Sequence, residues 1–173
     1  MSKLLYFAYG SNMSMPRLTS RVPSARAITS AKLVGHNFTF HKISITGSGK
    51  CHIACTNNPD DIVWGIVFEI LAIEKILLDE KEDLGRGYNV KQVSVSGKNG
   101  EIISAFTYYG LVLESSLKPF IWYKEHVLRG AEEHDLPPDY IKVIQAFKSI
   151  PDPDKKIHEH ELSIYRQQIK RLA

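Results

Sequence analysis

The order of apolar and polar positions divides the chain into a strand-rich first part and a helical last part. Leu4 to Ala8 form a short apolar run, and Lys32 to Ile45 alternate in the manner of one half-buried strand that ends at a glycine-containing turn. Lys50 to Thr56 is predicted to pair with that strand, and a polar loop follows it. Val63 to Ile70 is apolar enough for a strand that is buried on both faces.

The pattern then changes from strand to helix and back. Ala72 to Glu82 has helical spacing, with the apolar positions Ile73, Ile76, Leu77 and Leu84 separated by three, four or seven residues. Two further strands, joined by a Gly-rich hairpin turn, and three helices complete the prediction: strands at Tyr88 to Val95 and Ile102 to Tyr109, then helices at Pro119 to His134, Asp139 to Lys148 and His158 to Leu172.

This order of elements predicts an α+β fold, with an antiparallel or mixed sheet, curved or closed, and helices on its outside. The chain has 173 residues, of which 43% are hydrophobic, and no segment reads as a linker or a repeat. We therefore expect a single domain over residues 1–173.

The charge pattern excludes some classes of partner. A net charge of +3 is too small to predict nucleic-acid binding, and the basic residues near the C-terminus are expected to form a solvated helix face; they are Lys155, Lys156, Arg166, Lys170 and Arg171. The longest apolar stretch, Val63 to Ile73, is far too short to span a membrane, and the N-terminal apolar run is too short for a signal peptide. A soluble, cytoplasmic protein without nucleic-acid or membrane partners is expected.

The loop after the first strand is the best local indication of a functional site. Tyr9, Gly10, Ser11 and Asn12 directly follow the apolar run, and Pro16 behind them is placed for a helix entry. Gly10 allows the backbone to approach a ligand closely. Successive N–H groups in such a loop can bind a carboxylate or a developing oxyanion.

An acidic group ends the first long helix. It contains Asp79, Glu80, Glu82 and Asp83, although carboxylates at a helix C-terminus oppose the helix dipole. If the apolar line of Ile73, Ile76 and Leu77 faces the core, Glu80 points inward; if the line of Leu78 does, Glu82 points inward. Periodicity alone does not choose between them.

Other catalytic signatures are absent from the sequence. It has no GxSxG, HExxH or phosphate-binding glycine motif. Cys51 and Cys55 are interpreted as free thiols rather than zinc ligands, and His36, His41 and His52 as structural residues. A reaction that needs no metal, no cofactor and no nucleophilic side chain fits this inventory best.

Five segments, in this order, resemble the gamma-glutamylcyclotransferases. They are FAYGSNM at Phe7 to Met13, VPSA at Val22 to Ala25, VWGIVFEI at Val63 to Ile70, LDEKE at Leu78 to Glu82 and RGAEEHDLPPDY at Arg129 to Tyr140. A YGSN loop, a strand that contains WG and an LDxxE helix end form a specific ordered set. The resemblance implies a small mixed, mostly antiparallel β-barrel with flanking helices.

The resemblance also implies the roles of particular residues. Glu82, rather than Glu80, corresponds to the proton-transfer acid of the family. The implied substrate-binding residues are Tyr9, Gly10, Ser11, Asn12, Met13, Tyr88, Tyr108 and Tyr123. The chain departs from many relatives at Asp83, where they carry glycine. No cofactor or metal is implied, the partner is a small gamma-glutamyl compound, and relatives suggest a homodimer.

The reaction implied by the resemblance is intramolecular. The α-amine of a gamma-glutamyl compound attacks its own γ-carbonyl, closes the ring of 5-oxoproline and expels an amine, while Glu82 shuttles the proton. Three alternatives remain open from the sequence. They are a cyclotransferase for gamma-glutamylamines or for an acyl intermediate, an amide hydrolase that uses Ser11, and a non-catalytic binding module.

Overall fold

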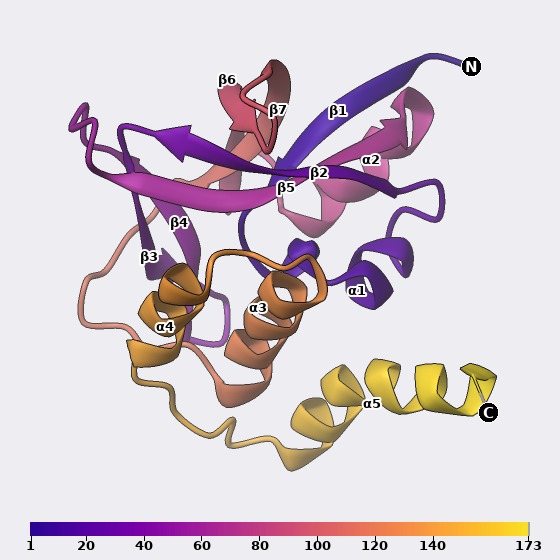
Figure 1. Ribbon diagram of the computed structural model, residues 1–173. Coiled ribbons are helices and arrows are strands. Elements are labelled where there is room, and N and C mark those ends of the chain that lie inside the picture. The colour runs from indigo at the N-terminus through magenta and orange to yellow at the C-terminus, as the bar shows by residue number, and fades with distance from the viewer. Residues whose placement is uncertain (173) are drawn as a thin grey trace.

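Five strands close into a barrel in the order β1, β5, β2, β6, β7 (Figure 1). The computed structural model describes residues 1–172, with side chains described as far as Arg166. The barrel strands are β1 (Lys3–Ala8), β2 (Arg26–Val34), β5 (Ile62–Leu71), β6 (Tyr88–Gly97) and β7 (Ile102–Gly110). All of their pairings are antiparallel except that of β1 with β7, which are parallel at Tyr6 and Phe106. The predicted mixed, mostly antiparallel barrel is confirmed.

The parallel seam between β1 and β7 is fastened by a buried side chain. The Thr107 hydroxyl donates a 2.7 Å hydrogen bond to the Phe7 carbonyl. Phe7 is itself fully buried, because its strand is packed on both sides. The end of β1 therefore has a fixed position, and the loop that follows it starts from a rigid element.

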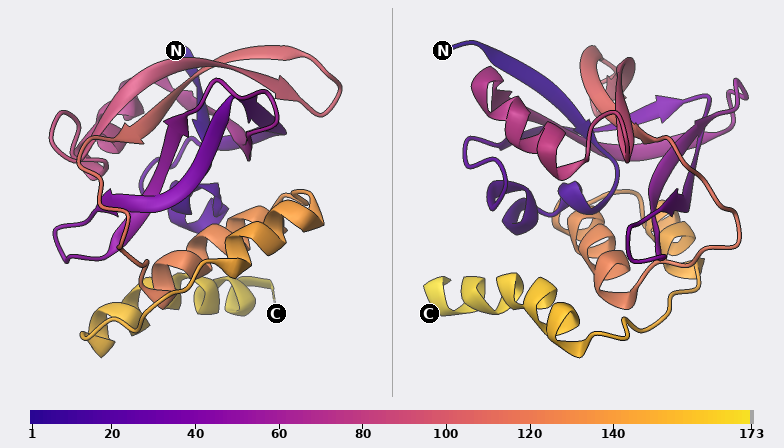
Figure 2. Two further views of the ribbon diagram at one scale, coloured as in Figure 1. Left: turned by 90° about the vertical axis from the view of Figure 1, so that its left-hand side faces the viewer. Right: turned by 180° about the vertical axis from the view of Figure 1, so that it is seen from behind.

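A separate hairpin lies beside the barrel. It consists of β3 (His36–Ile43) and β4 (Gly49–Cys55), which are antiparallel and contact β5 and β7. Phe38 and Phe40 of this hairpin are buried, and Phe40 packs edge-on against Tyr123. The hairpin therefore joins the barrel to the helical layer beneath it (Figure 2).

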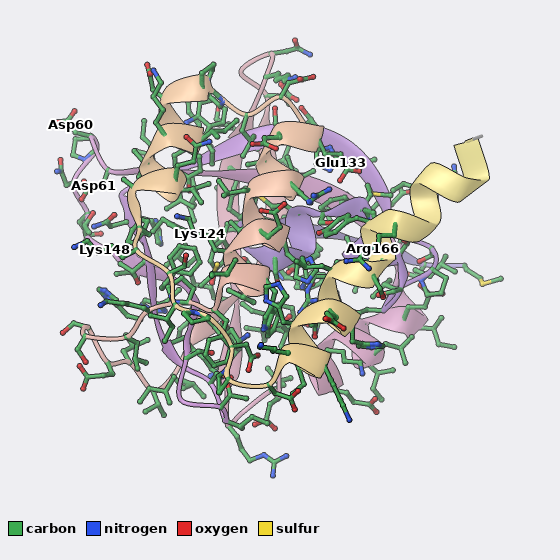
Figure 3. All side chains as sticks on the ribbon, turned by 90° about the horizontal axis from the view of Figure 1, so that it is seen from below. Asp60, Asp61, Lys124, Glu133, Lys148 and Arg166 are labelled. Atoms are coloured by element: carbon green, nitrogen blue, oxygen red, sulfur yellow. The ribbon has the colours of Figure 1, made fainter. Side chains whose placement is uncertain are left out.

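Helices cover one side and one end of the barrel. They are α1 (Met15–Thr19), α2 (Lys75–Lys81), α3 (Ile121–Glu133), α4 (Pro138–Ala146) and α5 (Lys155–Leu172), with short 3₁₀ turns η1 (Ser11–Met13) and η2 (Ala72–Glu74). Seen from below, α3 and α4 form a layer, and α5 crosses beside α3 and α1 (Figure 3). The helical C-terminal third of the prediction is confirmed. Among the described residues, no helix has the length and apolar character needed to cross a membrane.

One prediction about an element was wrong. The single strand expected over Lys32 to Ile45 is broken at Gly35, whose φ of 74° is a left-handed conformation that ends β2 and starts β3. Of the two faces that periodicity left open for the first long helix, the line of Ile73 and Ile76 is exposed. Only Leu78 of α2 is buried.

The C-terminal basic residues are described only in part. Lys155, Lys156 and Arg166 are exposed, as expected for a solvated helix face. The side chains of Lys170 and Arg171 lie outside the described residues.

Candidate active site

The loop after β1 is held in place by close backbone contacts. It turns at Gly10 into η1, where the Met13 N–H donates to the Gly10 carbonyl at 2.9 Å. A Cβ atom on Gly10 would lie only 2.9 Å from Cβ of Cys51, so no larger residue fits there without displacement of β4. Gly130 of α3 has the same role on the other side, where a Cβ would lie 2.4 Å from the Ser14 nitrogen. The loop is thus packed between the hairpin and α3.

The acidic end of α2 reaches this loop through one residue. Leu78 is fully buried and Glu80 is exposed, so the line that faces the barrel runs from Leu78 to Glu82. Glu82 occupies the C-cap of α2 and its side chain is 14% exposed. The structure thereby distinguishes the two glutamates that periodicity left open, and it turns Glu82 toward the loop.

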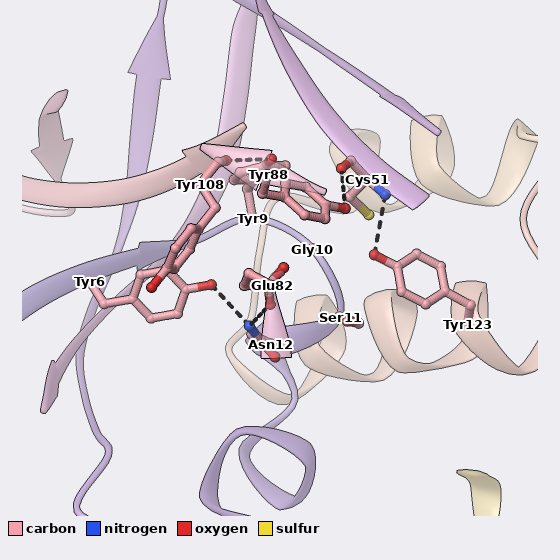
Figure 4. A pocket seen from close by; sticks show the side chains of 10 residues that line it. All are labelled: Tyr6, Tyr9, Gly10, Ser11, Asn12, Cys51, Glu82, Tyr88, Tyr108 and Tyr123. Atoms are coloured by element: carbon pink, nitrogen blue, oxygen red, sulfur yellow. Dashed lines mark hydrogen bonds between the residues drawn. The ribbon is translucent and has the colours of Figure 1, made fainter. Parts of the chain in front are cut away.

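The Glu82 carboxylate is held by two partners that offset its unfavourable place at a helix C-terminus. The Asn12 amide donates to Oε1 at 3.0 Å, and the guanidinium of Arg21 lies 3.5 Å from the same oxygen. Arg21 also donates to Oδ1 of Asn12 at 3.0 Å, which fixes the orientation of the amide. Among the described residues, no side chain hydrogen-bonds Oε2. One carboxylate oxygen is oriented, and the other faces the cavity (Figure 4).

Tyrosines form most of the remaining wall. A narrow cavity of about 30 Å³ is lined by Tyr6, Tyr9, Gly10, Ser11, Asn12, Cys51, Glu82, Tyr88, Tyr108 and Tyr123. Burial raises the pKa of Tyr6, Tyr9, Tyr88 and Tyr123 far above neutrality, so their hydroxyls are uncharged. We refer to this cavity as the tyrosine pocket.

The hydroxyls of the tyrosine pocket fall into two groups. The Tyr9 hydroxyl donates to the Tyr108 carbonyl, and that of Tyr88 donates to the Cys51 carbonyl. The Tyr108 hydroxyl donates to Asp79, and all three distances are 2.6–2.8 Å. Tyr6 and Tyr123 instead accept hydrogen bonds, from the Asn12 amide at 3.0 Å and the Cys51 N–H at 3.2 Å. The first three hydroxyls hold the wall together, whereas those of Tyr6 and Tyr123 receive a hydrogen bond, and the side chain of Cys51 also lies beside the Tyr123 hydroxyl.

The structure brings together all of the proposed site residues except one. Met13 is fully buried and lies against Gly130 of α3 rather than in the wall of the tyrosine pocket. Two lining residues were not among the predicted ones. Tyr6 has the alternation of an ordinary strand residue, and Cys51 was interpreted only as a free thiol. Both residues are buried, as core residues are. Burial raises the pKa of Cys51 to about 12, so its thiol is neutral.

The alternatives from the sequence differ in how well the geometry supports them. Among the described residues, no histidine hydrogen-bonds the Ser11 hydroxyl, which a serine nucleophile needs as its base. Asp83, the departure from the family pattern, takes a left-handed conformation (φ 51°) and pairs with exposed Arg86 at 2.8 Å. The geometry instead offers one oriented carboxylate, the start of a short helical turn and the hydroxyls of Tyr6 and Tyr123 around one cavity.

Comparison with known proteins tests the family resemblance that the sequence motifs indicated. Residues 62–144 match the model of the AIG2-like family. Gamma-glutamylcyclotransferases of Mus musculus and Homo sapiens are each 32% identical to the chain over 148 residues, which is 83% of this chain and 78% of theirs.

The chain belongs to the gamma-glutamylcyclotransferase family. A solved gamma-glutamyl cyclotransferase structure superimposes with a TM-score of 0.82 over 92% of this chain and 99% of the other, at 29% identity. Membership confirms the predicted family and an enzyme of the cyclotransferase type. The roles given to individual residues of the tyrosine pocket stay predictions.

Proposed function

We propose that the protein converts a gamma-glutamyl amino acid or related gamma-glutamyl amide into 5-oxoproline and a free amine. The names of its relatives support the gamma-glutamyl part of the substrate. The observation that carries the mechanism is the oriented Glu82 carboxylate beside the Gly10 loop.

Each step of the reaction has a candidate group in the tyrosine pocket. The α-amine forms a bond to the γ-carbonyl carbon, and the bond from that carbon to the leaving nitrogen breaks. Glu82 takes a proton from the attacking amine and returns it to the leaving nitrogen, so no water is consumed and no net proton is lost. Because both reacting groups belong to one molecule, the enzyme needs mainly to hold the substrate folded.

The negative charge that develops on the γ-carbonyl oxygen needs donors. In this proposal the N–H groups of Ser11 and Asn12, at the start of η1, and the hydroxyl of Tyr123 provide them. Neutral Tyr6 lies beside Asn12 and helps to keep Glu82 in place. One well-placed donor of this kind contributes about 3 kcal/mol to stabilising a transition state.

The experiment is the Glu82→Gln variant, assayed for 5-oxoproline by mass spectrometry. We expect the variant to fold and to bind a gamma-glutamyl dipeptide, but to lose on the order of 10²–10⁴-fold in kcat, because the amide cannot shuttle a proton. Glu80→Gln is the matched control, since it makes the same change two residues away on the exposed side of α2 and leaves kcat unchanged. Wild-type turnover by Glu82→Gln contradicts the mechanism, and glutamate as the product indicates hydrolysis instead.

A further inference from the structure

A second cavity of about 210 Å³ adjoins the tyrosine pocket. Ser11, Glu82, Tyr88 and Tyr123 line both cavities, so the two share a wall. The other charged residues that line the second cavity are Arg17, Arg21, Lys42, Lys50, Lys81 and Asp83. We call it the basic vestibule, since five of its residues are cationic and two are acidic.

Both arginines and both carboxylates of the vestibule already form ion pairs. Arg17 pairs with Glu161 of α5, Arg21 with Glu82, and Asp83 with Arg86. Among side chains 1–166, by contrast, no carboxylate lies within salt-bridge distance of Lys42, Lys50 or Lys81. The vestibule therefore holds an excess of positive charge that the protein itself does not neutralise.

Two of these lysines lie directly opposite each other. Lys42 of β3 and Lys50 of β4 are partners in the antiparallel register, which puts their side chains on the same face of the hairpin. Their ammonium groups turn toward different aromatic rings, so each can bind a separate anionic group of a ligand.

Aromatic rings orient both ammonium groups without neutralising them. Lys50 Nζ lies 4.1 Å from the ring centre of Trp122 and 3.9 Å from that of Tyr123, and Lys42 Nζ lies 4.9 Å from that of Tyr88. Tyr88 and Tyr123 also line the tyrosine pocket. A half-buried, unpaired ammonium is unfavourable, and cation–π contacts compensate for only part of its lost hydration.

We propose that the basic vestibule binds the leaving amine of the substrate, and that Lys42 and Lys50 select gamma-glutamyl compounds whose leaving amine carries two anionic groups, such as an acidic amino acid. This inference rests on the proposed function. It assigns one anionic group to each lysine, and it makes a leaving amine without negative charge a poor substrate.

The test compares three substrates that differ only in the leaving amine: gamma-glutamylglutamate, gamma-glutamylalanine and gamma-glutamylethylamide. Their leaving amines carry two, one and no carboxylates. For the wild-type protein we expect kcat/KM for 5-oxoproline release to rise in the order ethylamide, alanine, glutamate, by on the order of tenfold for each carboxylate.

The variants Lys42→Gln and Lys50→Gln should each reduce the ratio of kcat/KM for gamma-glutamylglutamate to that for the ethylamide by about tenfold. The ratio is the readout, because any effect of a variant on Tyr88 or Tyr123 applies to both substrates and cancels in it. Lys98→Gln is the matched control: it removes one positive charge in the turn between β6 and β7, lines neither cavity, and should leave the ratio unchanged. Both lysines are only partly buried and glutamine keeps the inner part of the side chain, so we expect both variants to fold.

Distinct results overturn the two proposals. If the wild-type protein turns over the three substrates equally, or if the lysine variants slow all three to the same extent, the vestibule does not select the leaving amine. The second result means that the lysines bind the glutamyl portion, which all three substrates share. If none of the three yields 5-oxoproline, the proposed function itself is wrong.

Discussion

At the scale of single residues, two charged side chains of the site have unusual surroundings: Glu82 has two polar partners, and Lys50 has no carboxylate partner among the described side chains. Glu82 is oriented by both Asn12 and Arg21 and lies where a helix dipole disfavours it. Lys50 lies over two rings with no carboxylate beside it among the described side chains. Groups in such unfavourable positions mark functional sites more often than well-paired surface charges do.

The pKa of Lys50 gives a prediction about pH. Burial, together with the positive charges of Arg17 and Arg21, lowers this pKa to about 7, against the opposing effect of Glu161. Lys42 faces it from the neighbouring strand. Since the ammonium is present below pH 7 and neutral above it, the preference for gamma-glutamylglutamate over the ethylamide should decrease as pH rises from 6 to 8.

The measurement is the ratio of the two kcat/KM values at each pH. Titration of the glutamyl α-amine, which both substrates share, cancels in this ratio. In Lys50→Gln the ratio should be independent of pH over the same range. A preference that increases with pH in the wild-type protein contradicts the assignment of Lys50.

At the scale of elements, α2 is the most weakly attached part of the site. Leu78 is the only buried residue among its seven, while Ile76 is 59% exposed and Leu77 is 38% exposed. The proposed proton-transfer residue is therefore carried by a short helix that is attached to the barrel by one buried apolar side chain, Leu78, and by the hydrogen bond from Tyr108 to Asp79. Local opening of α2 moves Glu82 away from the Gly10 loop.

Leu78→Ala tests this dependence. A buried Leu→Ala change costs about 2–5 kcal/mol, and here the loss falls mainly on the docking of α2. We expect kcat/KM to fall at least about tenfold, with faster amide hydrogen exchange in α2 than in the barrel strands. Ile76→Ala on the exposed face is the control and should leave both quantities unchanged. Normal activity in Leu78→Ala would show that other contacts position Glu82.

The sequence predicted most elements and failed where tertiary contacts decide. Apolar strand-like segments bounded by turn residues identified β4, β5, β6 and β7. The same pattern missed the start of β2, where Arg26, Ala27 and Ile28 are exposed, and the break at Gly35. The face of α2 was ambiguous for a related reason, since the exposed Ile76 and Leu77, together with Ile73 of η2, resemble a core line more than Leu78 alone does.

The site was predicted as far as local motifs and family resemblance extend. The Gly10 loop and Glu82 belong to recognisable segments. Tyr6 and Cys51 enter the tyrosine pocket only because β1 and β4 meet there, and nothing local distinguishes them from core residues. The sequence analysis missed the lysines of the vestibule, because only the folded structure shows that, among the described side chains, no carboxylate pairs with them.

At the scale of the whole molecule, a buried polar network ties α5 to the rest of the fold. His126 of α3 is fully buried and hydrogen-bonded to Tyr165 at 2.6 Å and to Glu161 at 3.1 Å, both in α5. The Tyr165 hydroxyl also contacts that of Ser14, directly after the Gly10 loop, at 3.0 Å. Glu161 in turn pairs with Arg17. Helix α5 is thus linked by polar contacts to Ser14 and Arg17, close to the Gly10 loop.

This network predicts loss of stability in acid. Burial lowers the pKa of His126 to about 4, so between about pH 6.5 and 4 the unfolded chain takes up a proton that the folded protein does not. Burial alone would raise the pKa of Glu161, but the hydrogen bond from His126 and the charge of Arg17 lower it to about 2. The stabilisation from Glu161 is therefore present above about pH 4.3 and lost as the pH falls toward 2.

The free energy of unfolding, measured with urea from pH 7 to 4, should fall by up to about 1.4 kcal/mol per pH unit through His126. In His126→Gln this slope should be reduced, although the variant starts from a lower stability. His160→Gln, in the exposed part of α5, is the control and should keep the wild-type slope. An unchanged slope in His126→Gln means that other groups cause the acid sensitivity.

The dispersed origin of the tyrosine pocket has a consequence for protein synthesis. The Gly10 loop is synthesised before Glu82, Tyr108 and Tyr123, which follow about 70 to 110 residues later. Strand β1 closes the barrel only once β7 exists, and α5 contacts the loop later still. A nascent chain that lacks β7 or α3 therefore has an incomplete tyrosine pocket, and the pocket forms only after these elements have been synthesised and have folded.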